Sequence, residues 1–431
     1  MMYNLTGEQL HIFNSFIKFI DNDVPNMFIL SGGAGVGKTF LTIKMIQYCF
    51  NMYSQNEIMI LCPTHKALNV IKNKFDGDSL DVKFQTITKF FDKKLKYNSD
   101  GTKYFQNVKL KKIQRCIVFV DESSMISDND VHEFIKLSKI DDIKLVFIGD
   151  YAQLEPVETG GVSLIFNEKY LCDNYAQYEK YELKQIVRSN ETELINIYSD
   201  FRKFVTMGDS DEISFKKEWY NKTNDSVLFT SSYNKFIELI KNNFTIEGCK
   251  IIAYRNDTVN NYNKFIRTIL FKDRNKFVTG EKLIFNEPYL DIYNNNDEIT
   301  VKNANIVERV HPKNGVKYKL YELITTDNDI IYSLHEDSIS NYQKYFETFK
   351  KQMQNSKKNW KSYYEDYKLF NPPITYSYAI TVHKSQGSTI NVCFIDMTDI
   401  YNTLTMVKPE SLEKSLYTAV SRASQKLYCY F

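Results

Sequence analysis

The sequence contains few cysteines and no long apolar run. Its seven cysteines are scattered without a C-x-x-C pair, and several lie in apolar segments such as CIVFV at 116–120. This spacing excludes a disulfide or cysteine-based metal framework and is typical of reduced, buried thiols in a cytosolic protein. No apolar run approaches ~18–20 residues and the first ten residues lack a basic-then-apolar signal, so we expect neither a membrane span nor a secretion signal.

The sequence also lacks an excess of charge of either sign. The 55 Lys and Arg residues nearly balance the 53 Asp and Glu residues, which leaves a formal net charge of +2. No global field therefore favours a polyanionic partner, and any nucleic acid has to be bound by local sites. Arginine is scarce, with eight residues in the chain, so each position that keeps Arg is a candidate for needing its fork of donors.

The chain is long enough for several domains. Its 431 residues exceed one ordinary core, which holds ~100–200 residues. Hydrophobic residues at 43% and charged residues at 25% are values of folded, soluble domains. Aromatic residues make up 15%, almost all of them Tyr and Phe, and we expect most of these rings in cores.

Hydrophobic periodicity predicts an α/β fold. Apolar runs at 27–30, 58–62, 116–120 and 144–148 alternate with helical or polar segments. Such alternation is the pattern of a parallel sheet covered by helices. Between the second and third runs, residues 94–108 have two short half-apolar runs around Asn-Ser-Asp-Gly, which predicts a β-hairpin.

The rest of the chain predicts a second α/β domain interrupted by an insertion. Residues 249–267 are typical of a strand followed by a helix, and short runs separated by turn residues from 276 onward indicate a small β-barrel or curled sheet. Aromatic residues recur at helical spacing between 340 and 370, and we assign them to packing between helices. The predicted boundaries are 1–175 for the first domain, with the hairpin inserted at about 91–108, then 176–275 and 373–431 for the second domain, and 276–372 for an inserted β-barrel and helical accessory domain.

The segment GGAGVGKT at 32–39 follows an apolar strand, opens a helical segment and matches the pattern G-x-x-x-x-G-K-[ST]. Backbone N–H groups of such a loop wrap phosphate oxygens at a helix N-terminus. Lys38 then reaches the β- and γ-phosphates, and Thr39 supplies a hydroxyl to Mg²⁺. The predicted nucleotide-binding residues of this loop are Gly32, Gly33, Ala34, Gly35, Val36, Gly37, Lys38 and Thr39.

Two further loops carry candidate catalytic residues. In VDESS, directly after the strand at 116–120, Asp121 is expected to hold the Mg²⁺ shell and Glu122 to orient and deprotonate the attacking water. In GDYAQLEPV, Gln153 has an amide that can donate to a γ-phosphate and accept from water. These roles need a P-loop in the same protein, since each motif alone is more often solvated surface.

Further segments accompany these motifs, in the order and approximate spacing of superfamily 1 helicases. They are CPTHKALNV (62–70), FQTITKFF (84–91), LKQIVRSN (183–190), YAITVHKSQGST (378–389) and YTAVSRAS (417–424). The chain resembles this family, and within it the bacteriophage Dda and RecD-like 5′-to-3′ group, from Thr6 to about Ser424, although weakly at 190–248 and 300–370. The resemblance implies two RecA-like P-loop motor domains, with the hairpin in the first and an SH3-like barrel plus helices in the second.

The resemblance also implies roles for single residues. Gln9 is implied to recognise adenine, although a Gln at this position also completes a capping box with Thr6, and the two roles are compatible. Arg188 and Arg422 match the arginines that reach the γ-phosphate from the second domain, and Gly387, next to Gln386, lies in a loop that links nucleotide to nucleic acid. The residues implied to line the single-strand groove are Pro63, Thr64, His65, Thr86, His383 and Lys384, although a lone His is more often structural.

The hairpin corresponds to the family's strand-separating pin, with Phe91 or Tyr97 as an apolar edge against the last base pair; a merely decorative hairpin is the alternative. We expect an ATP- and Mg²⁺-dependent motor that translocates 5′-to-3′ on single-stranded DNA and unwinds duplex junctions. It is expected to work as a monomer in the cytoplasm of a phage-infected or bacterial cell, with single-strand-binding or replication proteins as possible partners. An RNA-directed helicase and a P-loop switch that does not move are the alternatives.

Overall fold

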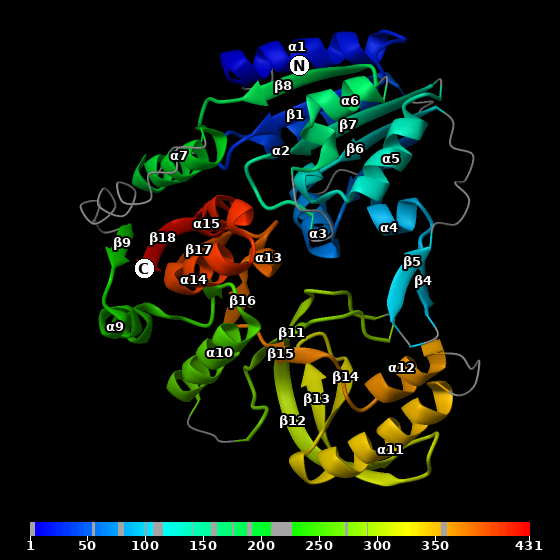
Figure 1. Ribbon diagram of the computed structural model, residues 1–431, viewed down its shortest axis with the longest axis vertical. Coiled ribbons are helices and arrows are strands. Elements are labelled where there is room, and N and C mark those ends of the chain that lie inside the picture. Colours follow the sequence, from blue (N-terminus) through cyan, green and yellow to red (C-terminus); the bar gives the residue numbers. More distant parts are fainter. Residues whose placement is uncertain are drawn as a thin grey trace. The chain divides into compact units, whose positions relative to one another are not determined.

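The structure is a computed structural model. In it the chain forms two compact units, which are described separately (Figure 1). The first unit contains Met1–Phe90, Leu110–Val259 and Ile380–Phe431, and the second contains Phe91–Lys109 and Asn260–Ala379. The residues that the structure describes are 5–53, 57–75, 82–98, 100, 102–106, 115–140, 142–156, 162–174, 176–187, 192–207, 226–271, 275–290, 292–354 and 360–431.

The first unit begins with a six-stranded parallel sheet of order β3-β2-β6-β7-β1-β8. Its strands are β1 (Met27–Gly32), β2 (Glu57–Cys62), β3 (Val82–Thr86), β6 (Cys116–Val120), β7 (Ile143–Gly149) and β8 (Tyr178–Leu183). The four predicted runs are β1, β2, β6 and β7, and they are almost entirely buried because helices cover both faces. The four apolar runs of the sequence therefore predicted the positions of these strands correctly.

Helices on one face of this sheet form a single core with it. Phe16 of α1 (Gly7–Asp21), Met45 of α2 (Lys38–Met52) and Ile71 of α3 (His65–Lys74) pack with Phe28 and Phe119 from the strands. On the other face, Phe134 of α5 (Asp128–Leu137) meets the Phe147 ring edge-on at 5.3 Å between centroids. Alternate strand residues thus serve opposite faces, as the two-residue period requires. The short helices α4 (Ile87–Phe90) and α6 (Glu168–Asp173) complete this domain.

Two strands of the first sheet were not predicted. β3 lies at one edge and β8 at the other, where β8 pairs in parallel with β1 from Met27↔Tyr178 to Gly32↔Leu183. The predicted domain boundary at 175 is therefore wrong, because the first sheet extends to Leu183. The sequence YEKYEL of β8 is mostly polar and the strand is only partly buried. It therefore lacks the apolar run that marked the central strands.

The first unit also contains a second sheet, of order β16-β10-β17-β18-β9. Its strands are β9 (Val227–Thr230), β10 (Cys249–Ala253), β16 (Ala379–Thr381), β17 (Ile390–Asp396) and β18 (Ala423–Tyr430), and the pairs β10·β17, β17·β18 and β18·β9 are parallel. The accompanying helices are α7 (Thr192–Met207), α9 (Tyr233–Asn243), α10 (Asn256–Leu270), α13 (Val382–Ser385), α14 (Met397–Val407) and α15 (Leu412–Val420). Helix α7 packs against α15 and β18, so it belongs to this second sheet.

The second unit contains a five-stranded antiparallel sheet of order β14-β13-β12-β11-β15. Its strands are β11 (Lys282–Phe285), β12 (Glu298–Val310), β13 (Lys317–Thr325), β14 (Ile330–Leu334) and β15 (Ile374–Tyr376). Two predicted short runs merge into the 13-residue β12. The boundary at 373 is wrong, because β15 pairs with β11 in this inserted sheet. Closure into an SH3-like barrel stays a prediction.

The hairpin and two helices complete the second unit. β4 (Lys94–Tyr97) pairs antiparallel with β5 (Lys103–Gln106), which confirms the predicted hairpin. The aromatic stripe lies on α11 (Glu336–Gln354) and α12 (Trp360–Lys368), where Tyr342, Phe346 and Tyr363 are buried against β13 and β14. The stripe is helix packing, as predicted. Over the described part of the chain, the helices are too short or too polar to cross a membrane.

Candidate active site

The candidate catalytic residues follow the strands of the first sheet at their carboxyl ends. The P-loop follows β1, Asp121 and Glu122 follow β6, and Asp150 follows β7. Because all six strands are parallel, these ends meet at one edge, which is where open α/β sheets bind ligands.

The P-loop has the backbone that a phosphate-binding loop needs. Gly35 and Gly37 have φ of 80° and 83°, a region that a side chain disfavours, and Gly37 is the N-cap residue of α2. At Gly32 a Cβ would lie 2.8 Å from the carbonyl oxygen of Leu183, so the loop packs tightly against the end of β8. Glycine is therefore required at Gly35 and Gly37 by the backbone conformation, and at Gly32 by the lack of space for a Cβ.

Lys38 lies within this loop. Its Nζ donates to the carbonyl oxygens of Gly32 at 2.6 Å and Gly33 at 2.8 Å. Burial lowers the pKa of Lys38, against the opposing charges of Asp150 and Glu122. A desolvated cation flanked by carboxylates and loop carbonyls is a strong binding partner for a phosphate, because little water has to be displaced from it.

Gln9 contacts the P-loop and also caps its own helix. Its backbone N–H donates to Thr6 Oγ1 at 3.3 Å while its side chain accepts from the Thr6 N–H at 3.2 Å, which confirms the capping box. Its Nε2 donates to the carbonyl oxygen of Val36 at 3.4 Å. Gln9 is 1% exposed and is thus fixed beside the loop; its contact with adenine stays a prediction.

Asp121 and Glu122 form a strained acidic pair. Glu122 has a left-handed φ of 54°, unusual for a residue with a side chain, and its N–H donates to Asp121 Oδ1 at 2.9 Å. Burial first, and the charge of Glu122 second, raise the pKa of Asp121 to about 6. Backbone strain and a disfavoured charge together are typical of a functional site.

The loop after β7 carries Asp150 and Gln153. Asp150 is 1% exposed and accepts hydrogen bonds from the Ala152 N–H at 3.2 Å and the Tyr417 hydroxyl at 2.6 Å. Gln153 is buried as well, and within the described residues its Oε1 has no hydrogen-bond partner. A buried acceptor left unsatisfied is costly, which supports the prediction that Gln153 binds water or phosphate.

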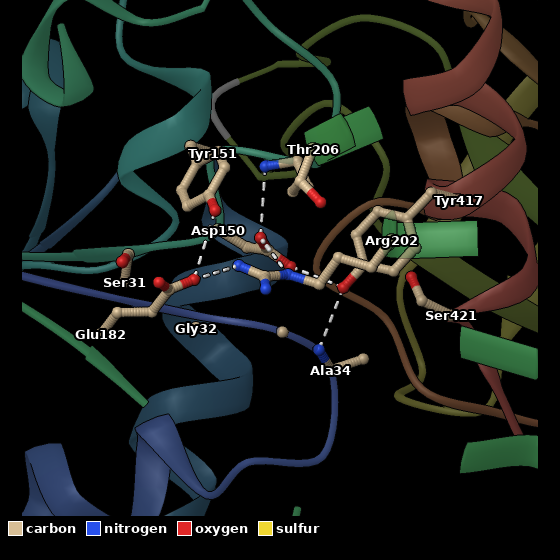
Figure 2. A network of polar contacts seen from close by, with 12 residues as sticks. Ser31, Gly32, Ala34, Asp150, Tyr151, Glu182, Arg202, Thr206, Tyr417 and Ser421 are labelled. Atoms are coloured by element: carbon tan, nitrogen blue, oxygen red, sulfur yellow. Dashed lines mark hydrogen bonds and ion pairs between the residues drawn. The ribbon is translucent and has the colours of Figure 1, made fainter. Parts of the chain in front are cut away.

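Two residues from helices of the second sheet reach the P-loop (Figure 2). Tyr417 is the first residue of the YTAVSRAS segment, to which the resemblance assigned no role at this position, and Arg202 lies in no motif. The Ala34 N–H donates to the Tyr417 hydroxyl at 3.1 Å. Arg202 of α7 packs against Gly33, where a Cβ would lie 3.0 Å from Arg202 Cδ. The one signal that pointed to Arg202 was the scarcity of arginine.

Charged partners on both sides hold Arg202 in place, as Figure 2 shows. Its Nη2 donates to Glu182 at 2.8 Å, its Nε contacts Asp150 at 3.4 Å, and its guanidinium lies over the Tyr151 ring at 5.1 Å. Burial alone would lower the pKa of Arg202, but the carboxylates raise it above its ordinary value. This arginine is therefore a fixed cation beside the P-loop.

The loop after β7 has further bonds to the second sheet's elements. The Leu154 N–H donates to Thr418 Oγ1 at 3.1 Å, and its carbonyl oxygen accepts from Gln386 Nε2 at 3.4 Å. Glu155 forms ion pairs with Lys408 at 3.1 Å and Lys414 at 3.0 Å. The sequence motifs did not reveal these lysines, because ion pairs between distant segments have no local pattern.

The two predicted arginines differ in what the structure describes. Arg422 is 6% exposed and donates through Nε to the Thr418 carbonyl at 3.0 Å, through Nη2 to Ser421 Oγ at 2.8 Å, and through Nη1 to the Ser388 carbonyl at 3.4 Å. Its fork thus binds its own sheet's loops in this structure. Arg188 lies outside the described residues.

Gly387 joins the catalytic pair to helix α3. It has a φ of 72°, and a Cβ there would lie 3.5 Å from Ala67 Cβ and 3.8 Å from Glu122 Oε1. Ala67 belongs to the CPTHKALNV segment. The Gly387 loop of the second sheet therefore lies close to a candidate catalytic carboxylate and to a helix implied to hold nucleic acid. Its role in linking nucleotide to nucleic acid stays a prediction.

The predicted strand-binding residues lie at the ends of strands, and several hydroxyls have structural partners. Thr64 Oγ1 caps α3 by accepting from the Ala67 N–H at 3.2 Å, and Thr86 Oγ1 accepts from the Lys89 N–H at 3.3 Å. These threonines order the chain after β2 and β3; Pro63 lies between β2 and the N-cap Thr64, and His65 begins α3. Binding of nucleic acid by these residues stays a prediction.

His383 and Lys384 lie on the short helix α13. The His383 ring meets the Tyr254 ring edge-on at 5.7 Å. Burial lowers the pKa of His383, against the charge of Glu155, and burial also lowers the pKa of Lys384. A neutral imidazole and a partly desolvated ammonium are suited to weak, reversible contact with a phosphate backbone.

The hairpin's predicted edges are corrected by the structure. Phe91 is 2% exposed, so the prediction that it presents an apolar edge is wrong: it anchors the base of the hairpin. Tyr97 is half-buried and stacks on Tyr364 of α12 at 5.3 Å. The large hydrophobic side chains that the described part of the hairpin exposes are Leu95 at 42%, Tyr104 at 44% and Phe105 at 57%.

Family models match the two ends of the motif set. The model described as an AAA domain matches residues 20–159, and the model described as a UvrD-like helicase C-terminal domain matches residues 376–430. The two segments carry the P-loop and the Gly387 loop respectively. They therefore correspond to the first and second sheets.

Whole-chain relatives give the same answer. The chain is 29% identical over 509 residues to the uncharacterized protein R530 of Acanthamoeba polyphaga mimivirus and 22% identical over 455 residues to the ATP-dependent DNA helicase dda of Enterobacteria phage T4, each match covering 99% of both chains. The solved Pif1 helicase from Bacteroides, in complex with ADP-AlF3 and ssDNA, has the same fold at 18% identity and a TM-score of 0.52, over 99% of this chain and 92% of that chain. The chain is therefore similar to superfamily 1 helicases, among them the Dda, RecD and Pif1 helicases.

Proposed function

We propose that the protein is an ATP- and Mg²⁺-dependent DNA helicase that translocates 5′-to-3′ on single-stranded DNA and separates duplex DNA. The observation that carries this proposal is the position of Gly387, whose loop comes from the second sheet: a Cβ at this position would lie 3.8 Å from Glu122 Oε1 and 3.5 Å from Ala67 Cβ of α3. A P-loop switch needs no such bridge. A motor needs one, because each hydrolysis step has to change the grip on its track.

The residues of the P-loop edge fit ATP with Mg²⁺. Thr39 would hold the ion through its hydroxyl and Asp121 through its carboxylate, and a divalent cation would offset the burial and the charge of Glu122 that together raise the pKa of Asp121 to about 6. When bound, the ion neutralises charge on the β- and γ-phosphates. Lys38 and the loop's N–H groups hold those phosphates, and Arg188 and Arg422 are proposed to complete the site.

Glu122 and Gln153 divide the work on the attacking water. Glu122 accepts the proton, since its carboxylate lies next to a buried acid and a buried lysine. The unpaired Oε1 of Gln153 accepts from the water or its amide donates to the γ-phosphate. Because the Gly387 loop lies close to Glu122, we propose that movement of the second sheet alters the position of this base.

Single-stranded DNA is proposed to lie along the loops after β2 and β3 and along α13, with Phe105 and Tyr104 of the hairpin replacing Phe91 as the aromatic edge that meets the duplex. A balance of short hydroxyls and few cations favours repeated release over tight binding. We propose a monomer in the cytoplasm of an infected or bacterial cell, acting at duplex junctions with single-strand-binding or replication proteins.

Matched duplexes with a 5′ or a 3′ single-stranded tail test this proposal directly. With ATP and Mg²⁺ we expect unwinding of the 5′-tailed duplex and at least tenfold less of the 3′-tailed one. ATPase stimulation by single-stranded DNA and by RNA of the same sequence is measured in parallel. Unwinding of only the 3′-tailed duplex contradicts the direction, stronger stimulation by RNA contradicts the substrate, and ATP turnover without unwinding of either duplex contradicts a helicase.

Replacing the hairpin tip, residues 98–102, by a short Gly-rich turn tests the pin. We expect unwinding to be lost while DNA-stimulated ATP turnover is kept, because the tip lies outside the first unit that holds the P-loop. The narrower variant Phe105→Ala should lower unwinding severalfold, with Phe105→Tyr as its control. Unchanged unwinding by the tip variant would make the hairpin decorative.

A further inference from the structure

The Tyr417 hydroxyl forms a hydrogen bond with a backbone N–H group of the P-loop. Tyr417 lies on α15, and its hydroxyl accepts from the Ala34 N–H at 3.1 Å while it donates to Asp150 Oδ2 at 2.6 Å (Figure 2). Burial, and then the charge of Asp150, raise the pKa of Tyr417 well above its ordinary value, so the hydroxyl keeps the proton that it donates. All these atoms lie in the first unit.

A phosphate and this hydroxyl compete for the same donor. Loops of the G-x-x-x-x-G-K-[ST] type bind phosphates through their backbone N–H groups, and Ala34 is the third residue of that segment. One amide N–H makes one good hydrogen bond. A phosphate that takes the Ala34 N–H therefore removes one of the two bonds that hold Tyr417 in place.

Tyr417 is adjacent in the sequence to Thr418, whose hydrogen bonds hold elements of the second sheet in place. Next to Tyr417, Thr418 accepts the Leu154 N–H through Oγ1 and the Arg422 Nε through its carbonyl oxygen. A shift of Tyr417 moves the last turn of α15, and with it the carbonyl that holds the guanidinium of Arg422.

We propose that Tyr417 is a positioning residue that senses phosphate in the P-loop: its hydroxyl holds the Ala34 amide until a nucleotide phosphate takes that amide, and the resulting shift of α15 releases Arg422 from the Thr418 carbonyl toward the site. Asp150 keeps its bond to the hydroxyl and guides the movement, while Arg202 stays fixed by Glu182. This inference rests on the proposed ATP site.

The variant Tyr417→Phe, made in the full chain, tests the competition. Removing the hydroxyl frees the Ala34 amide, so we expect a fluorescent ATP analogue to bind about two- to tenfold more tightly, the fold-change of one net hydrogen bond. ATP turnover with single-stranded DNA should show a lower KM and also a lower kcat, because Arg422 is no longer released in step with binding. A purely structural role would instead weaken binding and lower turnover together.

Tyr181→Phe is the matched control. Its hydroxyl donates to Glu179 Oε2 at 2.8 Å, so the variant loses a tyrosine hydroxyl of the same unit away from the P-loop amides. We expect its nucleotide affinity to equal that of the unchanged protein. If Tyr417→Phe binds nucleotide as the control does, or more weakly while melting normally, the proposal is overturned. Failure of the unchanged protein to bind nucleotide would overturn the proposed function instead.

Hydrogen exchange in the unchanged protein keeps the proposal testable if Tyr417→Phe does not fold. Saturation with ADP or an ATP analogue should raise the exchange rate of amides in α15, Leu412–Val420, by at least a few fold. The exchange of α9, which belongs to the same sheet, should not change. No change in α15 at saturation contradicts the proposed movement.

Discussion

The carboxyl edge of the first sheet and the inserted sheet of the second unit use buried polar groups in opposite ways. At the edge, Asp121 is buried with a pKa raised to about 6, and Glu122 adopts a left-handed backbone. In the inserted unit, the Tyr342 hydroxyl is buried but donates to the carbonyl oxygens of Asp366 and Tyr367. At the edge, strain and repulsion thus coincide with the proposed chemistry, whereas the buried Tyr342 hydroxyl of the insertion is satisfied by hydrogen bonds.

This difference predicts which substitutions affect ATP turnover. Substitutions at the edge should reduce hydrolysis strongly and stability little, or even raise stability. Substitutions in the aromatic cluster of α11 and α12 should do the reverse. The following changes are ordered by their expected effect on hydrolysis.

Lys38→Ala should have the largest effect. It removes the cation that the loop holds at 2.6 Å and 2.8 Å from two carbonyls, and loss of such a phosphate contact lowers turnover by roughly 10²–10³-fold. Measurement of DNA-stimulated ATP hydrolysis, with circular dichroism to verify folding, checks this. A folded Lys38→Ala protein with more than a tenth of normal turnover would remove the P-loop from the mechanism.

Glu122→Gln should lower kcat by about 10²-fold while nucleotide binding is kept, since the amide preserves the shape but cannot take a proton. Single-turnover hydrolysis and equilibrium binding of a fluorescent nucleotide separate the two effects. Equal losses in kcat and affinity would assign Glu122 to binding. Glu179→Gln, a change on the same sheet at β8, is the matched control.

The pH dependence tests the Asp121 pair. Its folded pKa of about 6 lies above the ordinary 3.8, so its charge costs stability above pH about 6, and this cost is relieved as pH falls from about 6 to about 4. Mg²⁺ needs the charged form, so the Mg²⁺ concentration at half-maximal hydrolysis should rise about tenfold per pH unit below 6. Without Mg²⁺ at pH 7.5, Asp121→Asn should melt at a higher temperature than the unchanged protein.

An Mg²⁺ requirement that stays constant between pH 5 and 7 would contradict this assignment. So would an Asp121→Asn protein that melts lower at pH 7.5. Both measurements use the same buffers, and the unchanged protein at each pH is the control.

Phe346→Ala should have the smallest effect on hydrolysis. The ring is 1% exposed and meets Tyr342 at 4.6 Å between centroids, so its loss costs about 3–5 kcal/mol of stability in the second unit. ATP affinity should not change, because the P-loop belongs to the first unit. Differential scanning calorimetry and nucleotide binding check this, with Phe346→Leu as a milder control. A large loss of ATP affinity would show that the two regions are not separable.

Local patterns allowed much of this molecule to be predicted from sequence. The four central strands were visible as apolar runs because both of their faces are buried, and the P-loop because its geometry requires glycine. The edge strand β8 and the placement of β15 were predicted wrongly. Each depends on a partner strand far away in the sequence, which a local pattern cannot contain.

The sequence alone indicated the resemblance to superfamily 1 helicases and the residues predicted to hold phosphate, because the constraints of a phosphate loop act over a few neighbouring positions. Only the tertiary structure decided that Phe91 is buried, that Gly387 lies close to Glu122, and that Tyr417 and Arg202 reach the P-loop from the second sheet. Those contacts join residues as far as 383 positions apart. Whether such residues meet, and how deeply they are buried, depends on how the sheets pack.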